Sequence, residues 1–374
     1  MSGPAHEAGS RHQTQLKHPD GLLKDFHVHN TLTIKESEAL KDFFGKTSLL
    51  MPDFAYFCLL KKKRKRPMIK PIYFAPLQGY TDDVYRRIHH ELVGGIESYF
   101  TPFVRMEGGG VRTKDMRDIR PEFNKGVPVV PQIIAKTMKE FTYLTDIVEA
   151  KGYKWIDINM GCPFPLQAKH GRGSGLLAHT DIIEEMAKAI DAKKDINFSV
   201  KMRLGWESKD EWRPVLDILN GIHLRQITLH PRIGIQQYKG ELDMDSFFEF
   251  YAGCKHQLVY NGELKTVEEM QLMVERFPGL AGIMVGRGLL ARPWLAAEYE
   301  SGEEWPQEKR RAMLHEFHNR LMAHYETTAN SEAQLHGRLR LFWEYMEEEL
   351  GRKLHKKIMK AGNLKNYLAA VREV

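Results

Sequence analysis

The 374-residue sequence contains few of the features that mark secreted, metal-binding or membrane-spanning proteins. It has only three cysteines, Cys58, Cys162 and Cys254, which are too few and too scattered for a disulfide framework or a zinc site. No run of about 18 apolar residues occurs, and the N-terminus has no apolar signal region. These absences predict no membrane span, no secretion and no bound metal, and they favour the reducing environment of the cytoplasm.

The composition that is present favours a large folded protein. Hydrophobic residues make up 42% of the chain and aromatic residues 10%, which is enough for a packed core. The formal net charge is +6, so an anionic partner is compatible with the sequence without being identified by it.

The first 67 residues differ from the rest of the chain. Residues 1–21 are polar and without period, and residues 61–66 read KKKRKR. This basic run could be a nuclear-import signal, a nucleic-acid-binding arm or a solvated tether. We expect residues 1–67 to be a flexible and dispensable extension, with Met68 as an alternative natural start.

From Met68 onward, apolar strand patterns alternate with amphipathic helix patterns. The expected strands are 71–79, 98–103, 127–134, 155–160, 197–205, 225–232, 257–264 and 280–288. The expected helices between them are 81–92, 138–152, 180–194, 212–222 and 266–277. No G-x-G-x-x-G follows the first strand, which disfavours a doubly wound sheet. The pattern therefore predicts an α/β fold, a (β/α)8 TIM barrel over residues 68–300.

The last part, residues 301–374, has no strand pattern. Two stretches carry apolar residues at helical spacing, namely Met313, Leu314, Phe317, Leu321 and Tyr325, and then Leu339, Phe342, Trp343, Met346 and Leu350. Such stripes predict a small C-terminal helical bundle. The basic stretch 351–360 would then lie on its surface, either as a solvated face or as a phosphate-binding patch.

Polar and conformationally special residues stand where the predicted strands end. In a barrel these ends converge on one mouth, so we expect the chemistry there. They are Ala75 to Gln78, Gln132, Asn159, Cys162, Lys201, Arg203, His230, Arg232, Asn261, Gly262, Gly286, Arg287 and Gly288.

The ends of the seventh and eighth strands favour a phosphate-bearing cofactor. Glycines there let backbone N–H groups approach a phosphate, and Arg287 adds a charged fork, although each glycine alone is explained by a turn. Lys201 within a strand needs an anion nearby. The amides of the strand ends could hold a polar heterocycle, and His230 is either a ligand contact or a hydrogen-bonded core residue.

Cys162 lies between Gly161 and Pro163 at the end of a strand. A lone cysteine is most often a small buried hydrophobe, but this one is held at the predicted mouth. A thiol is mostly protonated at neutral pH, so it can donate a proton or act as a nucleophile. The position indicates a reactive cysteine and leaves its role open.

Taken together, several motifs resemble the tRNA-dihydrouridine synthase family. They are APLQGYTD (75–82), INMGCP (158–163), VKMRLG (200–205), LHPR (229–232), YNGEL (260–264) and VGRGLLARPW (285–294), with GRLRLFWEYM (337–346) in the bundle. The resemblance implies an FMN-containing TIM barrel followed by a helical tRNA-binding domain at 301–374. It also implies that NADPH reduces FMN, that the flavin passes a hydride to C6 of a tRNA uridine, and that Cys162 delivers a proton to C5.

The resemblance carries roles over to particular residues. Those implied to bind FMN are Pro76, Leu77, Gln132, Lys201, His230, Asn261, Gly262, Gly286 and Arg287. Those implied to meet the tRNA are Asn159, Lys169, Arg172, Arg203 and Arg338. It implies no stable protein partner.

The chain departs from the family at Thr101-Pro102, at Phe164-Pro165 and at Arg292. Two other functions are compatible with parts of the sequence. One is an FMN barrel acting on a free pyrimidine or another small molecule, like a dihydroorotate dehydrogenase or an ene-reductase. The other is a catalytically retired RNA-binding module, which loss of the cysteine or of the phosphate-site glycines would favour.

Overall fold

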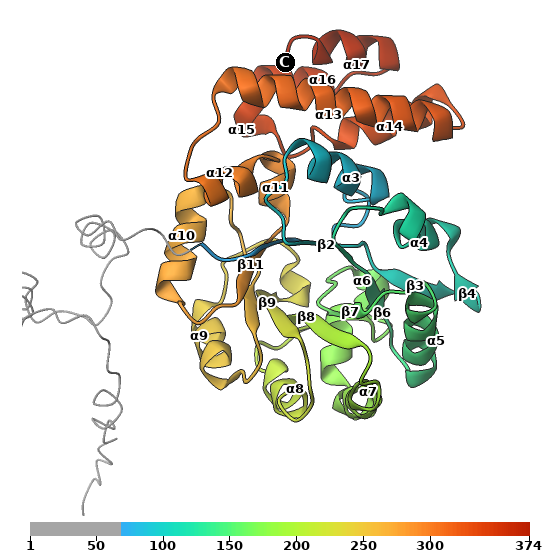
Figure 1. Cartoon of the computed structure of the whole chain (residues 1–374), viewed down its shortest axis with the longest axis vertical. Coiled ribbons are helices and arrows are strands. Elements are labelled where there is room, and N and C mark those ends of the chain that lie inside the picture. The colour runs from blue at the N-terminus through green and yellow to red at the C-terminus, as the bar shows by residue number, and fades with distance from the viewer. Residues whose placement is uncertain (1–68) are drawn as a thin grey trace, which may run out of the picture. The chain divides into compact units, whose positions relative to one another are not determined.

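The computed structural model describes residues 69–374, so the expectations for residues 1–67 lie outside the described residues. Residues 67–374 form one compact unit by their contacts. Figure 1 shows a curled sheet surrounded by helices, with further helices at the C-terminal end of the chain.

Parallel strands close into the predicted barrel. They are β1 (Ile72–Phe74), β2 (Ser98–Phe100), β5 (Val129–Val130), β6 (Gln132–Ile134), β7 (Trp155–Met160), β8 (Asn197–Gly205), β9 (Gln226–Ile233), β10 (Leu258–Tyr260) and β11 (Gly282–Val285). β5 pairs with β2 and β6 pairs with β7, and only Pro131 separates β5 from β6. These two short strands therefore act as one, and they join the ends of the sheet into the (β/α)8 barrel that the sequence predicts.

Strand periodicity explains what fills the barrel. In β7, Ile156, Ile158 and Met160 belong to the large apolar core, while the alternate residues face the other way. A separate apolar cluster lies on the other, inward face of the strands and is made of Tyr73, Ala75, Phe100, Val130, Val259 and Met284, with Trp155 and Ala281 packed against it.

Helices follow most strands. They are α3 (Asp83–Leu92), α5 (Met138–Glu149), α7 (Thr180–Ala192), α8 (Trp212–Leu219), α9 (Met244–Gly253), α10 (Val267–Arg276), α11 (Arg287–Ala291) and α12 (Leu295–Ser301). Of these, α3, α5, α9 and α10 begin with a side-chain cap. Thr266 and Glu269 form a capping box at the start of α10. Between residues 69 and 374, no helix combines the length and apolar character needed to cross a membrane.

Several elements of the barrel region are not expected from the sequence, among them α9 and a hairpin after β2. β3 (Val104–Glu107) and β4 (Gly110–Val111) form an antiparallel hairpin, followed by α4 (Thr113–Asp118). Gly108 and Gly109 make its turn with φ of 59° and 86°, a region that favours glycine. The hairpin extends the sheet beyond β6 (Figure 1).

The C-terminal segment is helical, as predicted. It contains α13 (Gln307–Thr328), α14 (Glu332–Leu341), α15 (Glu347–Leu350), α16 (Arg352–Met359) and α17 (Leu364–Val371). The first predicted stripe is buried, but the second is interrupted because α14 ends at Leu341 and Phe342 to Met346 form a turn. Tyr85 of α3 packs against Phe317 at 4.8 Å between ring centroids, and the Tyr325 hydroxyl donates to Asp82 at 3.1 Å. These contacts join the bundle to the barrel.

Candidate active site

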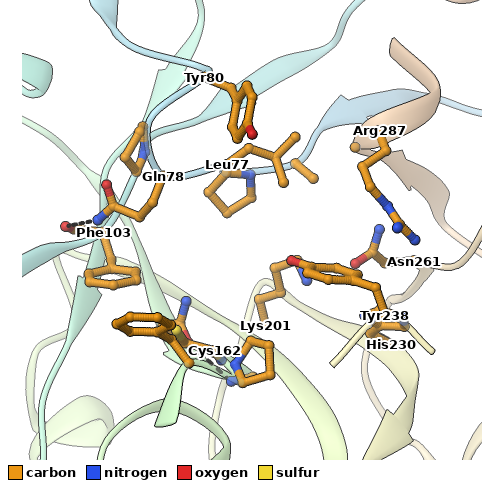
Figure 2. A pocket seen from close by; sticks show the side chains of 18 of the residues that line it. Leu77, Gln78, Tyr80, Phe103, Cys162, Lys201, His230, Tyr238, Asn261 and Arg287 are labelled. Atoms are coloured by element: carbon orange, nitrogen blue, oxygen red, sulfur yellow. Dashed lines mark hydrogen bonds between the residues drawn. The ribbon is translucent and has the colours of Figure 1, made fainter. Parts of the chain in front are cut away.

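A cavity of about 670 Å³ opens at the carboxyl ends of the barrel strands. Figure 2 shows side chains around it from β8 and β9 and from the segments after β1, β2, β7, β10 and β11. The predicted residues that line it are Pro76, Leu77, Asn159, Cys162, Lys201, Arg203, His230, Asn261, Gly262, Gly286 and Arg287. These residues are spread over more than two hundred positions of the sequence. The barrel brings them around one cavity because its parallel strands all end on the same side.

The backbone around Cys162 is held by hydrogen bonds on both sides. The Asn159 side-chain oxygen accepts from the backbone N–H groups of Gly161 at 3.0 Å and Cys162 at 2.8 Å. The Cys162 carbonyl accepts from the Ser174 hydroxyl at 2.9 Å. A Cβ at Gly173 would lie 2.7 Å from the Cys162 Cβ, so only glycine fits there. The thiol therefore sits on a tightly fixed loop at the cavity.

The protein environment keeps the Cys162 thiol protonated. Burial raises the pKa of this thiol above its usual value. A hydrogen bond from the Phe164 backbone and the positive charge of Arg203 oppose the rise without cancelling it. A thiol with a raised pKa is a poor nucleophile at neutral pH and retains a proton that it can donate.

Two cations of β8, Lys201 and Arg203, face the same cavity. Burial, together with the nearby charge of Arg203, lowers the pKa of Lys201 to about 8. Arg203 donates to the Ile233 carbonyl at 3.1 Å, and burial lowers its pKa to about 10. Among residues 69–374, Lys201 has no hydrogen-bond or ion-pair partner. Lys201 is half-buried in the cavity wall, and an ammonium without a protein partner at this position fits an anionic or hydrogen-bond-accepting ligand.

His230 presents a second unpartnered group. Its Nε2 atom is buried and has no hydrogen-bond partner among the described residues. Burial lowers the pKa of His230 well below its usual value, and the charges of Arg203 and Lys201 add to the effect. The imidazole is therefore neutral at neutral pH and can donate or accept one hydrogen bond to a ligand.

Arg287 at the start of α11 is oriented by an acidic residue that the sequence does not single out. Glu263 accepts from Arg287 at 2.8 Å and from the buried Arg232 at 3.0 Å. The Arg287 guanidinium carbon also lies 4.4 Å from the ring centroid of Tyr238. Asn261 is fixed as well, because its side-chain nitrogen donates to the Met284 carbonyl at 2.8 Å. The NGE stretch at 261–263 predicts roles for its amide and glycine but not for its carboxylate.

Packing explains two of the three glycines that the sequence assigns to a phosphate site. A Cβ at Gly262 would lie 2.0 Å from the Tyr260 hydroxyl, and one at Gly288 would lie 2.0 Å from the Leu264 carbonyl. At Gly286 a Cβ would make only ordinary contacts, the nearest 3.4 Å from Ala75. The first two glycines are therefore required by close packing of the protein itself.

Four predicted site residues do not line the cavity: Gln132, Lys169, Arg172 and Arg338. Gln132 is fully buried beneath Asn159 and donates to Asp157. Arg172 forms two hydrogen bonds with Glu140, at 3.1 and 2.6 Å, so its charge is already paired. Arg338 donates to Thr328 at 3.1 Å. Lys169 is exposed on the loop after Cys162, outside the cavity.

The structure adds cavity residues that the sequence does not single out. Arg105, Arg112 and Lys114 come from the β3–β4 hairpin and the start of α4, and Tyr345 comes from the helical bundle. Tyr345 packs against Tyr80 with ring centroids 5.4 Å apart. The bundle therefore contributes directly to the mouth of the barrel. Among residues 69–374, no group of three or more histidine, cysteine or acidic side chains is placed to hold a metal ion.

Comparison with known proteins places the chain in a family. The chain is 29% identical over 255 residues to the probable tRNA-dihydrouridine synthase 2 of Bacillus subtilis, covering 65% of this chain and 76% of that protein. It is 26% identical over 260 residues to the probable tRNA-dihydrouridine synthase of Rhodobacter capsulatus, covering 68% and 79%. It is 30% identical over 161 residues to tRNA-dihydrouridine synthase B of Vibrio vulnificus, covering 42% and 50%. The model of the dihydrouridine synthase (Dus) family matches residues 73–372. Because that match runs from the first barrel strand past the last helix, the chain belongs to the dihydrouridine synthase family.

Proposed function

We propose that this protein reduces a uridine of tRNA to 5,6-dihydrouridine, with FMN bound in the barrel cavity and NADPH as the electron donor. Family membership and relatives named tRNA-dihydrouridine synthases support the reaction. The observation that carries the assignment to this cavity is the fixed, protonated thiol of Cys162 beside two unpartnered polar groups, Lys201 and His230. A tRNA substrate and a reducing compartment favour the cytoplasm, and we propose no stable protein partner.

The cavity fits FMN by its volume and its donors. A volume of about 670 Å³ is within the range of cofactor sites. We assign Lys201 and His230 to the polar edge of the flavin ring, since the Lys201 ammonium and the His230 Nε2 atom lack partners among residues 69–374. We assign Arg287, with Asn261 and Gly286, to the ribityl-phosphate end, because Arg287 is pre-oriented there by Glu263. Pro76 and Leu77 supply an apolar wall for the ring. Gln132 and Gly262 act indirectly, by supporting neighbouring residues.

Bound FMN supplies the hydride that becomes attached to C6 of the uridine. The protein supplies the matching proton: Cys162 donates from Sγ to C5, which completes the reduction of the C5–C6 double bond. Its raised pKa keeps that proton in place until it is needed. The thiolate left behind lies near the charges of Arg203 and Lys201 and is stabilised by them.

The target base must leave its stack to enter the cavity, which costs a few kcal/mol. Cations at the rim offset this cost by contacting phosphates. Lys114 is placed to do so, whereas Arg105 and Arg112 already pair with Glu107 and Asp115. We assign residues 301–374 to tRNA binding, with Arg338 and the exposed cations Arg352, Lys353 and Lys356 of α16 on the bundle. Asn159 holds the backbone of Cys162, and Arg172 supports the loop after it through Glu140. Lys169, exposed on that loop, is assigned to contact with the tRNA.

The proposal is tested on the purified full-length protein. We expect bound FMN, identified by its absorbance and by analysis of the released chromophore. Under anaerobic conditions NADPH should bleach that absorbance, and unmodified tRNA should restore it with formation of dihydrouridine, measured by mass spectrometry of the digested RNA. A colourless protein that cannot be reconstituted with FMN would refute the cofactor. Reoxidation by orotate or free uridine, but not by tRNA, would instead establish a small-molecule oxidoreductase.

Removal of residues 1–67 is expected to leave folding, flavin content and tRNA reduction unchanged. The family match begins at residue 73, and the first described long-range contact is the Lys70 backbone N–H donating to Tyr299 at 3.1 Å. Thermal unfolding and flavin-to-protein ratio of a chain beginning at Met68 would test this. Failure of that chain to fold or to bind FMN would show that the extension is part of the enzyme.

A further inference from the structure

A chain of buried hydrogen bonds runs along the barrel interior beneath the cavity. The Asp157 carboxylate is its centre: one oxygen accepts from the Ser199 hydroxyl at 2.6 Å, and the other accepts from the Gln132 side-chain nitrogen at 2.7 Å. Asp157, Ser199 and Gln132 are all 0% exposed. The Ser199 oxygen also accepts from the Trp155 indole at 2.9 Å, so this end is anchored at the start of β7.

The other end of this series of hydrogen bonds reaches Cys162. The Gln132 side-chain oxygen accepts from the Asn159 side-chain nitrogen at 2.7 Å. The Asn159 oxygen in turn accepts from the backbone N–H groups of Gly161 and Cys162. We call this series of hydrogen bonds the relay. Every hydrogen bond in it is donated toward Asp157: from Cys162 to Asn159, from Asn159 to Gln132, and from Gln132 to Asp157.

The direction of donation is set by the Asp157 carboxylate, which can accept hydrogen bonds but cannot donate them. Burial raises the pKa of Asp157 to about 6, against the opposing effects of its hydrogen bonds from Gln132 and Ser199 and of the Lys201 charge. The carboxylate is therefore ionised at neutral pH and accepts only. The Gln132 amide must turn its nitrogen toward Asp157, which leaves its oxygen for Asn159. The Asn159 oxygen is then free to hold the cysteine loop.

We propose that Asp157 is a positioning residue for Cys162, acting through Gln132 and Asn159 to fix the backbone on which the proton-donating thiol stands. This inference deepens the proposed function and rests on it for the role of the thiol. It also gives Gln132 a role other than ligand contact, and it gives Asp157, which the sequence shows only as an inward residue of β7, a part in the reaction.

Asp157→Asn tests the relay because it replaces one acceptor oxygen by a donor of the same size. The new donor cannot face Ser199, because the Ser199 hydroxyl proton would then have no acceptor and water does not reach this buried side chain. The new donor must therefore face the Gln132 nitrogen, which is also a donor. The Gln132 and Asn159 amides must therefore both turn over, which places the Asn159 nitrogen against the backbone N–H groups of Gly161 and Cys162. These two N–H groups lie at the edge of the cavity and can bind water instead. The loop loosens there, and the Cys162 thiol becomes more exposed and more acidic.

The matched variants separate positioning from stability. Ser199→Ala removes the other hydrogen bond of the same carboxylate, on the side away from the cysteine. The double variant Gln132→Glu/Asp157→Asn exchanges the amide and the carboxyl group. It preserves the charge, reverses the hydrogen bond between residues 157 and 132, and still leaves an acceptor oxygen at residue 132 for the Asn159 side-chain nitrogen. Gln132→Met cuts the relay without changing the carboxylate and replaces Asp157→Asn if that variant fails to fold.

The main readout is the rate at which iodoacetamide alkylates Cys162 in the purified full-length protein without tRNA, measured by peptide mass spectrometry with Cys254 as the internal reference. We expect roughly a tenfold faster rate in Asp157→Asn, with kcat lowered roughly ten- to a hundredfold and KM for tRNA nearly unchanged. Ser199→Ala should leave the Cys162 rate at the wild-type value, and the double variant should restore it.

Equal Cys162 rates in Asp157→Asn, or in Gln132→Met, and the wild type would overturn the inference. So would a double variant that stays as fast as Asp157→Asn. Because alkylation requires no tRNA, a changed Cys162 rate in a protein that fails to reduce tRNA would uphold the relay and reject the proposed reaction instead.

Discussion

Replacement of Cys162 by alanine is expected to lower dihydrouridine formation by about 10²- to 10⁴-fold, the usual contribution of a general acid. Flavin content and reduction by NADPH should stay unchanged, because neither depends on a proton from this side chain. The raised pKa of the thiol supports this assignment, since it describes a group that holds a proton at neutral pH. The thiol's surroundings also include Arg203 and Lys201, which favour the thiolate once the proton has left.

The measurement is a single turnover of enzyme first reduced by NADPH and then mixed with unmodified tRNA under anaerobic conditions. The flavin absorbance reports hydride transfer, and mass spectrometry of the RNA reports the product. Cys254→Ala is the control, because Cys254 follows α9 and lies outside the cavity. Full activity in the Cys162 variant would show that another group or water donates the proton.

The barrel can be predicted because each strand carries its own local signal. Alternating apolar residues in 155–160 and turn residues at each end indicate a strand wherever it packs, and the rhythm of strand and helix then favours a barrel. The convergence of strand ends follows from the fold alone, which is why the sequence suffices to group Lys201, His230 and Arg287 at one mouth. Local pattern and topology together place the cavity.

The pairings inside the site cannot be predicted in the same way. Arg172 looks like a free cation in sequence, but Glu140, 32 residues away, holds it. In sequence, Glu263 looks like part of a turn. In the structure it follows β10, and the strands on either side, β9 and β11, bring Arg232 and Arg287 to it. Gln132 is expected at the flavin and instead supports Asn159 from below. In each case the partner is chosen by three-dimensional contact, which one sequence does not record.

The helical bundle shows the same limit. Spacing in 339–350 predicts the buried face but also a continuous helix, whereas the chain turns after Leu341. Phe342, Trp343 and Met346 are buried all the same. The turn also places Tyr345 at the mouth of the barrel, where the bundle meets the cavity. Hydrophobic periodicity thus reports what is buried more faithfully than it reports where a helix ends.

Replacement of Lys201 by methionine is expected to weaken FMN binding by about 10- to 100-fold, the cost of losing a hydrogen bond from a charged group. Methionine keeps the apolar stem and removes the charge. The pKa of Lys201, lowered to about 8 by burial and Arg203, makes a second expectation possible. Below about pH 8 the side chain is an ammonium that attracts an anionic ligand, and above it the side chain is a neutral amine. Affinity of the wild type should therefore fall as the pH rises from about 7 to about 9.

The two expectations are measured together by titrating FMN into flavin-free protein at several pH values. The phosphate of FMN stays dianionic over this range, because the second pKa of a phosphate monoester is about 6, so it contributes no slope. The Lys201→Met variant should bind weakly with no dependence on pH, and Lys201→Arg should bind without dependence on pH because guanidinium stays charged. Cys162→Ala is included because the thiol also titrates at alkaline pH. A slope that persists in Lys201→Met and disappears in Cys162→Ala would assign the titration to the thiol and remove Lys201 from the flavin site.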